Sequence, residues 1–515
     1  YLASQIDVYQ SLAETYVKAA NPEGALGAVE LASAKYLIEQ LESADDPDSS
    51  ADREEVHLFD LLYDQSRSLG EAGNTGKTAD PRDDAQAARR LLAQLPAGTA
   101  IVRYANTARD RMIVFVVTSS GVSAVAVETG NRAAQTPETT AASPVFADES
   151  STRGLQRIAQ SEKAEVDVSS LTSAIRSHRN ALAGQAGMAQ GGTTSELGKS
   201  GNALYRYLIA PVERQLAGVS SLWIVPDGAL ALLPFESFVL PDGRYLVEAF
   251  DIRYVQSLRV AQILRDRTYD QPRKPLLALG GAIYEKEKDP DRETNGPSGD
   301  KERKAWEMAL AVTASRSSRQ GEWKNLPGTL AEVEAIGTLF PDARVLTGDD
   351  AAESRLKAMA TAGELANYRV LHFATHGMVV PDSPELSALV LSQTEPAGAD
   401  REDGFLSMGE VAKLRLAADL VTLSACETGL GRIYSGEGVV GLGQAFLVAG
   451  ANGVTLSLWQ VADESTKDLM VAVYGLVEKE GMPFAQALTR VKREFIKNRK
   501  YSHPFYWAPF VYYGQ

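Results

Sequence analysis

The sequence predicts an α/β protein with a mostly parallel sheet, preceded by a helical segment. In the last third, three apolar runs have the character of buried strands: RVLHFATHG (369–377), ADLVTLSAC (418–426) and ANGVTLSLWQV (451–461). Helices are predicted after the last two, and strands that alternate with helices pair in parallel with helices on both faces of the sheet. Residues 99–128 alternate with a period of two, which predicts three further strands.

The first 41 residues carry apolar and small side chains at helical spacing, with the turn sequence NPEG between two predicted helices. Residues 25–34 resemble the second half of a tetratricopeptide repeat. A single helix pair shows no period, so a plain helical hairpin stays open as an alternative. Beyond a polar break at 44–53, further helices are predicted up to about Leu69 and at 84–94.

The composition excludes several classes of protein. The net charge is −15, with 52 Lys and Arg against 67 Asp and Glu, so most of the surface would repel a phosphate backbone and we expect no direct nucleic-acid partner. No stretch of 18 apolar residues occurs, so no membrane span is expected. The one cysteine favours a reducing compartment, and we expect the cytoplasm. Because the chain starts YLASQID without Met, we expect it to continue upstream.

That one cysteine, Cys426, and a histidine, His376, lie at the ends of two predicted parallel strands. Ligands of open parallel sheets bind outside the carboxyl ends of the strands, so the two side chains are predicted to lie close together. A catalytic thiol needs a neighbouring imidazole to take its proton and later to protonate the leaving amine. The backbone N–H groups of Gly377 and Cys426 are the candidates for an oxyanion hole. The alternative for a lone cysteine is core packing.

Several motifs together carry a resemblance to a known family. HFATHG and SACETGLG, followed by GEGVVGLGQAFLVAGANGVTLSLWQVAD and the ending HPFYWAPFVYYG, resemble the CHAT family of caspase-like domains, which are associated with tetratricopeptide repeats and related to separase. SLWIVPDGALALLPFESF, LPGTLAEVEAI and PELSALVL extend the resemblance over most of residues 97–515. It implies His376 and Cys426 as the catalytic dyad. The residues after the cysteine are Glu-Thr-Gly, so an aspartate-specific caspase pocket is not implied.

The resemblance implies a caspase-like parallel-sheet sandwich in two halves. We expect a helical, repeat-like segment at 1–96, a degenerate pseudo-caspase half at 97–282, a charged insertion at 283–324 and a catalytic half at 325–515. Within the insertion, we interpret the basic sequence SRSSRQ as a candidate self-cleavage point, because we expect it to be exposed and expect basic residues to be preferred.

The predicted substrate-binding residues are Asp463, Glu437 and Trp459. The two acids flank the region where a substrate side chain would enter, and separase-like relatives have an acid in the segment that matches LWQVAD. A carboxylate there would select arginine or lysine before the scissile bond. An N-cap of the following helix is the alternative for Asp463, and Gln460 stands where separases carry another acid.

Two further motifs match cofactor-binding patterns only in part. GEGVVG (436–441) matches a dinucleotide-binding pattern, with Asp463 at a suitable distance, but it does not follow its strand directly. His372 and His376 have zinc-like spacing, yet they lie on a strand without a third ligand, so we interpret His372 as a core residue. His503 is expected to pack near the end of the chain with Trp507, whereas His178 and His57 are expected to face solvent.

The sequence therefore predicts a cysteine endopeptidase that needs no metal or organic cofactor. The resemblance implies that it cleaves specific protein substrates, and we expect a basic residue at P1. The N-terminal helices would bind a regulatory protein partner, and a signalling or defence role is implied by the resemblance. The alternatives are a catalytically silent scaffold for protein–protein interaction and, on GEGVVG alone, a nucleotide-binding protein.

Overall fold

A computed structural model describes the polypeptide over most of the predicted sheet regions. The described residues are 2–31, 33, 37–38, 40–41, 94–107, 111–130, 170–183, 194–284, 323–380, 384–394, 402–425, 432–434, 438–459 and 463–514. The parts of the chain outside them include Cys426, Glu437, His57, the polar break, the predicted helix to Leu69, residues 84–93 of the predicted helix at 84–94, and the charged segment 285–322.

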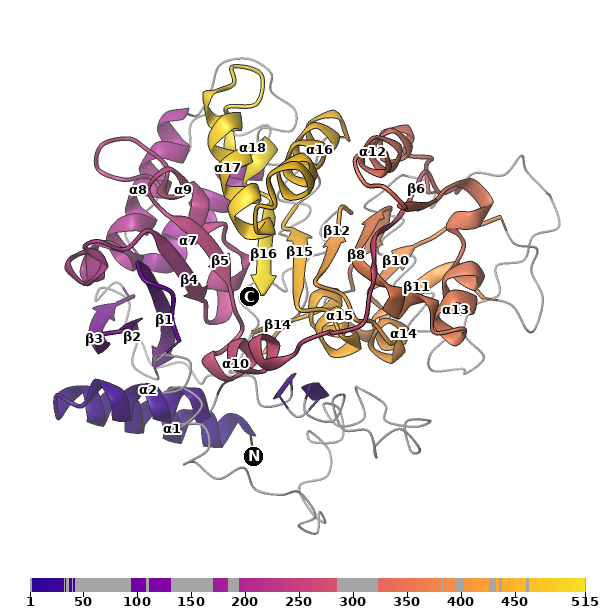
Figure 1. The fold of residues 1–515 in the computed structure, drawn as a ribbon. Helices are drawn as coiled ribbons and strands as arrows, with labels where there is room; N and C mark the ends of the chain where they lie inside the picture. The colour runs from indigo at the N-terminus through magenta and orange to yellow at the C-terminus, as the bar shows by residue number, and fades with distance from the viewer. Residues whose placement is uncertain are drawn as a thin grey trace, which may run out of the picture.

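Eleven strands of the described residues form one sheet, in the order β3-β2-β1-β4-β5-β16-β15-β12-β8-β6-β7 (Figure 1). All neighbouring strands pair in parallel except β1 with β2, β2 with β3 and β15 with β16. The predicted α/β class with a large, mostly parallel sheet is confirmed. The strands are β1 (Thr99–Thr107), β2 (Arg111–Thr118), β3 (Gly121–Glu128), β4 (Ser221–Val225), β5 (Asp251–Tyr254), β6 (Lys274–Gly280), β7 (Arg344–Leu346), β8 (Tyr368–Ala374), β12 (Leu420–Leu423), β15 (Gly453–Ser457) and β16 (Phe510–Gly514).

Each predicted strand run of the sequence becomes a strand of this sheet. Residues 99–128 form β1, β2 and β3, and the three apolar runs of the last third contain β8, β12 and β15. β6 lies between β8 and β7 although it precedes them by a long stretch of chain. The early strands join the late ones where β5 pairs with β16, so both parts share one continuous sheet.

Helices cover both faces of the sheet, as the alternation of strands and helices predicts. In the later part, α12, α16 and α17 lie on one face of the sheet, and α14 and α15 lie on the other (Figure 1). Buried apolar side chains of both groups pack in the cores on either side of the sheet. Burial of these apolar faces is the main stabilising contribution. The helices are α7 (Leu171–Ala183), α8 (Thr194–Leu208), α9 (Leu246–Ala249), α10 (Leu258–Asp266), α12 (Pro327–Gly337), α13 (Glu353–Thr361), α14 (Met408–Lys413), α15 (Leu442–Ala449), α16 (Asp463–Glu480), α17 (Phe484–Lys497) and α18 (Pro504–Trp507).

The predicted N-terminal helix pair is confirmed as α1 (Leu2–Lys18) and α2 (Pro22–Leu31). The side chain of Asn21 in the turn accepts a hydrogen bond from Gly24 N–H at 2.9 Å and so starts the second helix. Glu30 of α2 forms a buried ion pair with Arg103 of β1 and accepts the N–H of Leu258 at the start of α10. The helix pair is thereby fixed to the sheet through hydrogen-bonded, buried charges.

The expectation that His178 faces solvent is wrong. Its side chain on α7 is fully buried, and its ring nitrogens contact Ser200 Oγ at 3.0 Å and Ser237 Oγ at 2.8 Å. Burial lowers the pKa of His178 to about 3. The charged pattern of the helix did not reveal that α8 and the segment around Ser237 cover this face.

No helix among the described residues combines the length and apolar character needed to cross a membrane.

Candidate active site

The strand that carries His376 leaves the main sheet just before this residue. β8 ends at Ala374, and His376 begins β9 (His376–Met378). With β10 (Ala388–Val390) and β11 (Phe405–Ser407), β9 forms a separate three-stranded antiparallel sheet. His376 thus lies at the carboxyl end of β8, as predicted, and is half-buried.

The strand that leads to Cys426 is the direct neighbour of β8. β12 pairs with it in parallel, with Leu423 opposite Phe373, and Ser424 N–H donates to Phe373 C=O at 2.8 Å. Ala425 is the last described residue before Cys426, and its carbonyl accepts a hydrogen bond from the hydroxyl of Ser457 on β15. The predicted adjacency of the two strands is confirmed, whereas Cys426 itself lies outside the described residues.

The imidazole of His376 has a defined hydrogen bond. Its Nε2 lies 2.8 Å from the carbonyl oxygen of Lys324. Because a carbonyl only accepts, Nε2 must carry the proton, and in the neutral ring Nδ1 then has the free lone pair. Burial lowers the pKa of His376, while the Lys324 carbonyl and the negative charge of Asp463 oppose that change. The environment therefore favours a neutral ring that accepts a proton at Nδ1.

The backbone of Gly377 is directed by the alternating pattern of the small sheet. Leu391 N–H donates to Gly404 C=O at 2.8 Å, so β10 residues at odd positions, including Leu389, turn their backbone groups toward β11. Gly377 is the partner of Leu389 in the register of β9 and β10. Its N–H therefore points away from β10, toward the outer edge of the small sheet.

Two predicted substrate-binding residues are found near the same end of the main sheet. Asp463 is the first residue of α16 and is exposed, and its charge acts on the pKa of His376. It packs so closely against Gly328 in the first turn of α12 that a side chain at position 328 would overlap it. Trp459 is half-buried after β15 and donates its indole N–H to Phe505 C=O at 3.2 Å.

The remaining histidine interpretations have mixed outcomes. His372 is buried in the core, where its two ring nitrogens contact Glu332 at 2.9 Å and Tyr474 at 3.2 Å, as expected for a core residue. His503 uses Nδ1 to accept the N–H of Phe505 at the start of α18, and Trp507 is fully buried.

In GEGVVG, the residues Gly438–Val440 form β14, which pairs with β13 (Arg432–Tyr434) and not with the main sheet. A dinucleotide turn placed directly after a sheet strand is thus contradicted.

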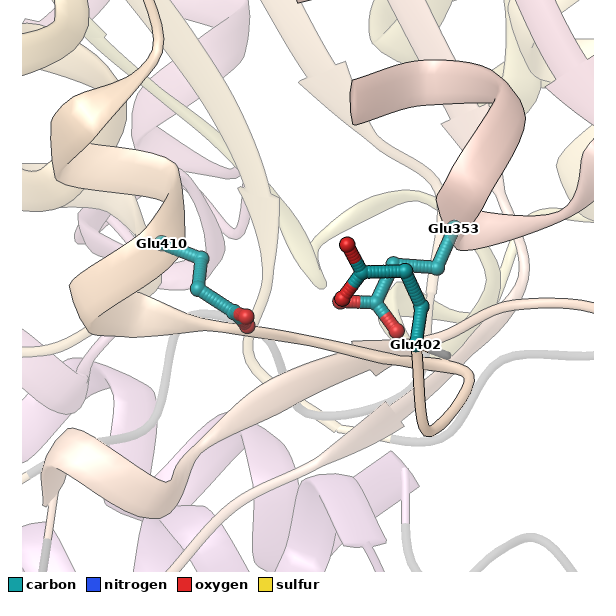
Figure 2. Close-up of side chains that lie close together, drawn as sticks. All are labelled: Glu353, Glu402 and Glu410. Carbon is teal, nitrogen blue, oxygen red and sulfur yellow. The ribbon is translucent and has the colours of Figure 1, made fainter. Parts of the chain in front are cut away.

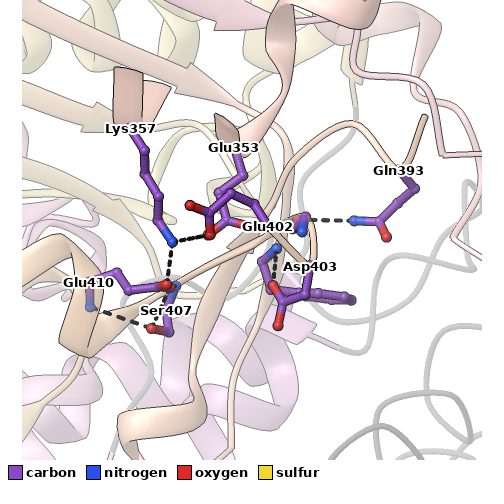
Figure 3. A network of polar contacts seen from close by, with 9 residues as sticks. Glu353, Lys357, Gln393, Glu402, Asp403, Ser407 and Glu410 are labelled. Carbon is purple, nitrogen blue, oxygen red and sulfur yellow. Dashed lines mark hydrogen bonds and ion pairs between the residues drawn. The ribbon is translucent and has the colours of Figure 1, made fainter. Parts of the chain in front are cut away.

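Sequence reasoning missed a cluster of acids near the small sheet. One carboxylate oxygen from each of Glu353, Glu402 and Glu410 lies within 4.8 Å of the corresponding oxygens of the other two (Figure 2). Lys357 Nζ lies 2.8 Å from Glu353 Oε1 and also pairs with Glu402 and Glu410 (Figure 3). The Lys357 ammonium group occupies the place that a metal cation would take, so we interpret the cluster as a network of polar contacts around Lys357.

This fold and this placement of His376 define an α/β domain whose candidate site lies at the carboxyl ends of two neighbouring parallel strands. Residues 198–515, more than half of the chain, match the CHAT domain family. The chain belongs to the CHAT domain family.

The curated relatives are much longer than this chain. Tetratricopeptide repeat protein 28 of Homo sapiens is 26% identical over 353 residues, which cover 61% of this chain and 13% of the human protein. The Mus musculus protein of the same name is 27% identical over 225 residues, or 37% of this chain and 9% of the mouse protein. This chain therefore spans only a small part of the length of these relatives.

Among solved structures, the Saccharomyces cerevisiae separase–securin complex is similar with a TM-score of 0.46 and 11% identity, over 96% of this chain and 34% of the matched chain. The Arg-specific cysteine proteinase gingipain R is similar with a TM-score of 0.36 and 10% identity, over 61% of this chain and 67% of its own.

Proposed function

We propose that this CHAT domain is a cysteine endopeptidase in which Cys426 is the nucleophile and His376 is its base. The observation that carries the proposal is the placement of His376 at the end of β8, directly beside the strand β12 that leads to Cys426. The hydrogen bond from Nε2 to the Lys324 carbonyl supports it further, because it leaves Nδ1 as the proton acceptor.

In the proposed reaction, the thiol proton of Cys426 passes to Nδ1 of His376 as the sulfur attacks the carbonyl carbon of the scissile peptide bond. The imidazolium then gives this proton to the leaving amine, and the C–N bond breaks. Water attacks the thioester with His376 again as base, which releases the acid product and restores the thiol. Backbone N–H groups of Gly377 and Cys426 would stabilise the oxyanion, and the outward direction of the Gly377 N–H supports its role.

The lowered pKa of His376 has a consequence for this mechanism. Burial favours the uncharged imidazole, so we infer that His376 takes the thiol proton during the attack rather than holding a stable thiolate–imidazolium pair in the free enzyme. The base would then be in its active, neutral form from below neutral pH upward. This chemistry requires neither a metal nor an organic cofactor.

Specificity for arginine or lysine before the scissile bond is the second part of the proposal. Asp463 supports it because its exposed carboxylate lies close enough to His376 to act on the pKa of that ring. A carboxylate beside the reacting centre would bind a substrate cation by a charge-assisted hydrogen bond. Glu437 and Trp459 are proposed to line the same pocket. The replacement Asp463→Asn should reduce cleavage after basic residues and leave thermal unfolding unchanged.

The N-terminal helices are proposed to bind a regulatory protein. Val8 and Leu12 of α1 are large apolar side chains with 65% and 38% of their surface exposed. The buried pair of Glu30 and Arg103 would connect a partner bound there to β1 of the main sheet. We further propose a protein substrate, no direct nucleic-acid partner and a cytoplasmic location, on the grounds of the acidic charge and the one cysteine.

A peptidyl acyloxymethyl ketone with arginine at P1 tests the dyad, because Cys426 is the only thiol in the chain. The wild type should be modified at Cys426, and His376→Ala should react roughly 10²-fold or more slowly, since a positioned base typically contributes a factor of that order. Iodoacetamide serves as the control for access to the thiol in both proteins. Equal rates of peptidyl-probe modification with and without the imidazole would contradict the proposed role of His376.

A further inference from the structure

Two aromatic side chains hold the imidazole of His376. The Tyr284 ring meets it edge to face, with 4.7 Å between ring centroids and 62° between ring planes. The Trp323 ring lies at 5.0 Å and 48°. Ring contacts of this kind contribute a preferred geometry in addition to buried area. Neither aromatic residue was among the site residues predicted from the sequence.

Tyr284 also fixes the backbone on which His376 stands. Its hydroxyl accepts the His376 N–H at 3.2 Å and donates to the Val390 carbonyl at 3.1 Å. His376 and Val390 are opposite each other in the register of β9 and β10. The Tyr284 hydroxyl therefore bridges the two strands at the position where a direct ladder hydrogen bond would otherwise form. The side chain is buried, so water does not readily replace this bridge.

The support is itself tied to rigid parts of the fold. Tyr284 N–H donates to Asn325 Oδ1 at 2.8 Å, which joins it to the stretch that contains Trp323 and Lys324. Both backbone polar groups of the neighbouring Ile283 are hydrogen-bonded: its N–H donates to Ser392 Oγ at 3.0 Å, and its carbonyl accepts Gln393 N–H at 2.8 Å.

Trp323 is held from the side of the small sheet. Its ring contacts Phe405 of β11 at 6.5 Å between centroids, with 63° between ring planes. The next residue, Lys324, supplies the carbonyl that accepts the Nε2 proton of His376. Trp323 packs its indole against the imidazole, and the adjacent Lys324 supplies the hydrogen-bond acceptor, so the packing of Trp323 also helps to place that acceptor.

We propose that Tyr284 and Trp323 are positioning residues that hold the His376 imidazole against the Lys324 carbonyl as the Nε2–H tautomer, with Nδ1 as its proton-accepting atom. The effect of this positioning on peptide cleavage rests on the proposed function, whereas the tautomer itself does not. A hydrogen bond at one ring nitrogen is a general means by which proteins select the histidine tautomer. Here the aromatic pair prevents the ring from turning away from that acceptor.

Nitrogen-15 NMR of histidine side chains measures the tautomer directly, and the chain has only five histidines to assign. His376→Gln identifies the signal of interest. In the full wild-type chain, His376 should be the Nε2–H tautomer at neutral pH. In Trp323→Ala, both tautomers should appear, and the pKa of His376 should rise toward its ordinary value because water reaches the ring.

Two further variants and one control variant keep the test decisive. Trp323→Phe retains a ring and should keep the wild-type tautomer, which distinguishes positioning from a general loss of packing. Tyr284→Phe retains the ring but removes the hydroxyl bridge, so both His376 tautomers should appear in this variant. Tyr501→Phe is the matched control, because it removes a hydroxyl that donates to Asp468 in another part of the fold. If Trp323→Ala does not fold, the Tyr284→Phe result decides.

A folded Trp323→Ala or Tyr284→Phe protein with an unchanged His376 tautomer and pKa would overturn the positioning role. The kinetic readout is separate: kcat for peptide cleavage should fall by up to about 10²-fold with little change in KM, as expected when a reacting group is displaced. If the tautomer changes in the variants while the wild type cleaves no peptide, the positioning proposal stands and the proposed peptidase function fails.

Discussion

Glu353 offers a quantitative test of how the acid cluster supports the small sheet. Its side chain is 1% exposed, and Oε2 accepts Gly404 N–H at 2.8 Å, just before β11 begins. Burial raises the pKa of Glu353 to about 8, and the charges of Glu410 and Asp403 add to that effect while Lys357 opposes it. The folded protein therefore holds a proton on Glu353 at neutral pH.

The sign and size of the effect on stability follow from this pKa. An unfolded glutamate ionises near 4.5, so between about pH 5 and pH 8 the folded state binds one more proton than the unfolded state. Stability then falls as pH rises, by about 1.4 kcal/mol per pH unit from this group. The contribution is fully present below pH 4.5 and is lost as pH passes about 8. The whole difference corresponds to about 5 kcal/mol.

Urea unfolding at several pH values between 5.5 and 8 measures this slope. Glu353→Gln keeps a side-chain oxygen that can accept Gly404 N–H and should lose the contribution of about 1.4 kcal/mol per pH unit. Glu402→Gln removes another, more exposed carboxylate from the same ammonium group and should retain the slope. If wild type and Glu353→Gln lose stability in parallel as pH rises, the proton is not held on Glu353 and the reasoning is refuted.

Three other replacements have defined expected results. Gly328→Ala should displace Asp463 and lower cleavage after basic residues, because the new methyl group overlaps its side chain; an unchanged P1 preference would contradict this. Ser457→Ala should slow probe modification of Cys426, because the Ser457 hydroxyl donates to the carbonyl of Ala425, the residue before the cysteine. Chemical denaturation checks that the variant is folded. Lys492→Met should cost about 3–5 kcal/mol in unfolding free energy because it leaves Glu236 buried without its cation, and adding Glu236→Leu should recover part of the loss.

Much of the fold was predictable because it depends on local patterns. Burial in a strand selects apolar side chains position by position, so it leaves a pattern in the local sequence. The period-two pattern of 99–128 and the apolar runs before His376 and Cys426 are patterns of this kind. The general rule for parallel sheets then placed the ends of β8 and β12 side by side. NPEG likewise marked the turn between α1 and α2, where Asn21 starts the second helix.

What could not be predicted depends on contacts between distant parts of the chain. The sequence around His178 has a charged helical pattern, and only the packing of α8 and the segment around Ser237 buries the ring. The contacts of His376 with Tyr284 and Trp323 join segments that are about 50 to 90 residues from it. The pairing of β6 with β8 brings Tyr284, which follows β6, close to His376. The number of residues between Tyr284 and His376 does not predict that they are close in space.

The measurement that tests the central proposal most directly is cleavage of a positional peptide library by the wild type, Cys426→Ala and His376→Ala, with products read by mass spectrometry. The account predicts cuts after arginine or lysine by the wild type that both variants lose. Cuts that persist in Cys426→Ala would contradict a cysteine endopeptidase. No cuts by the wild type, together with no modification of Cys426 by the peptidyl probe, would also contradict it and would favour a CHAT scaffold without catalysis.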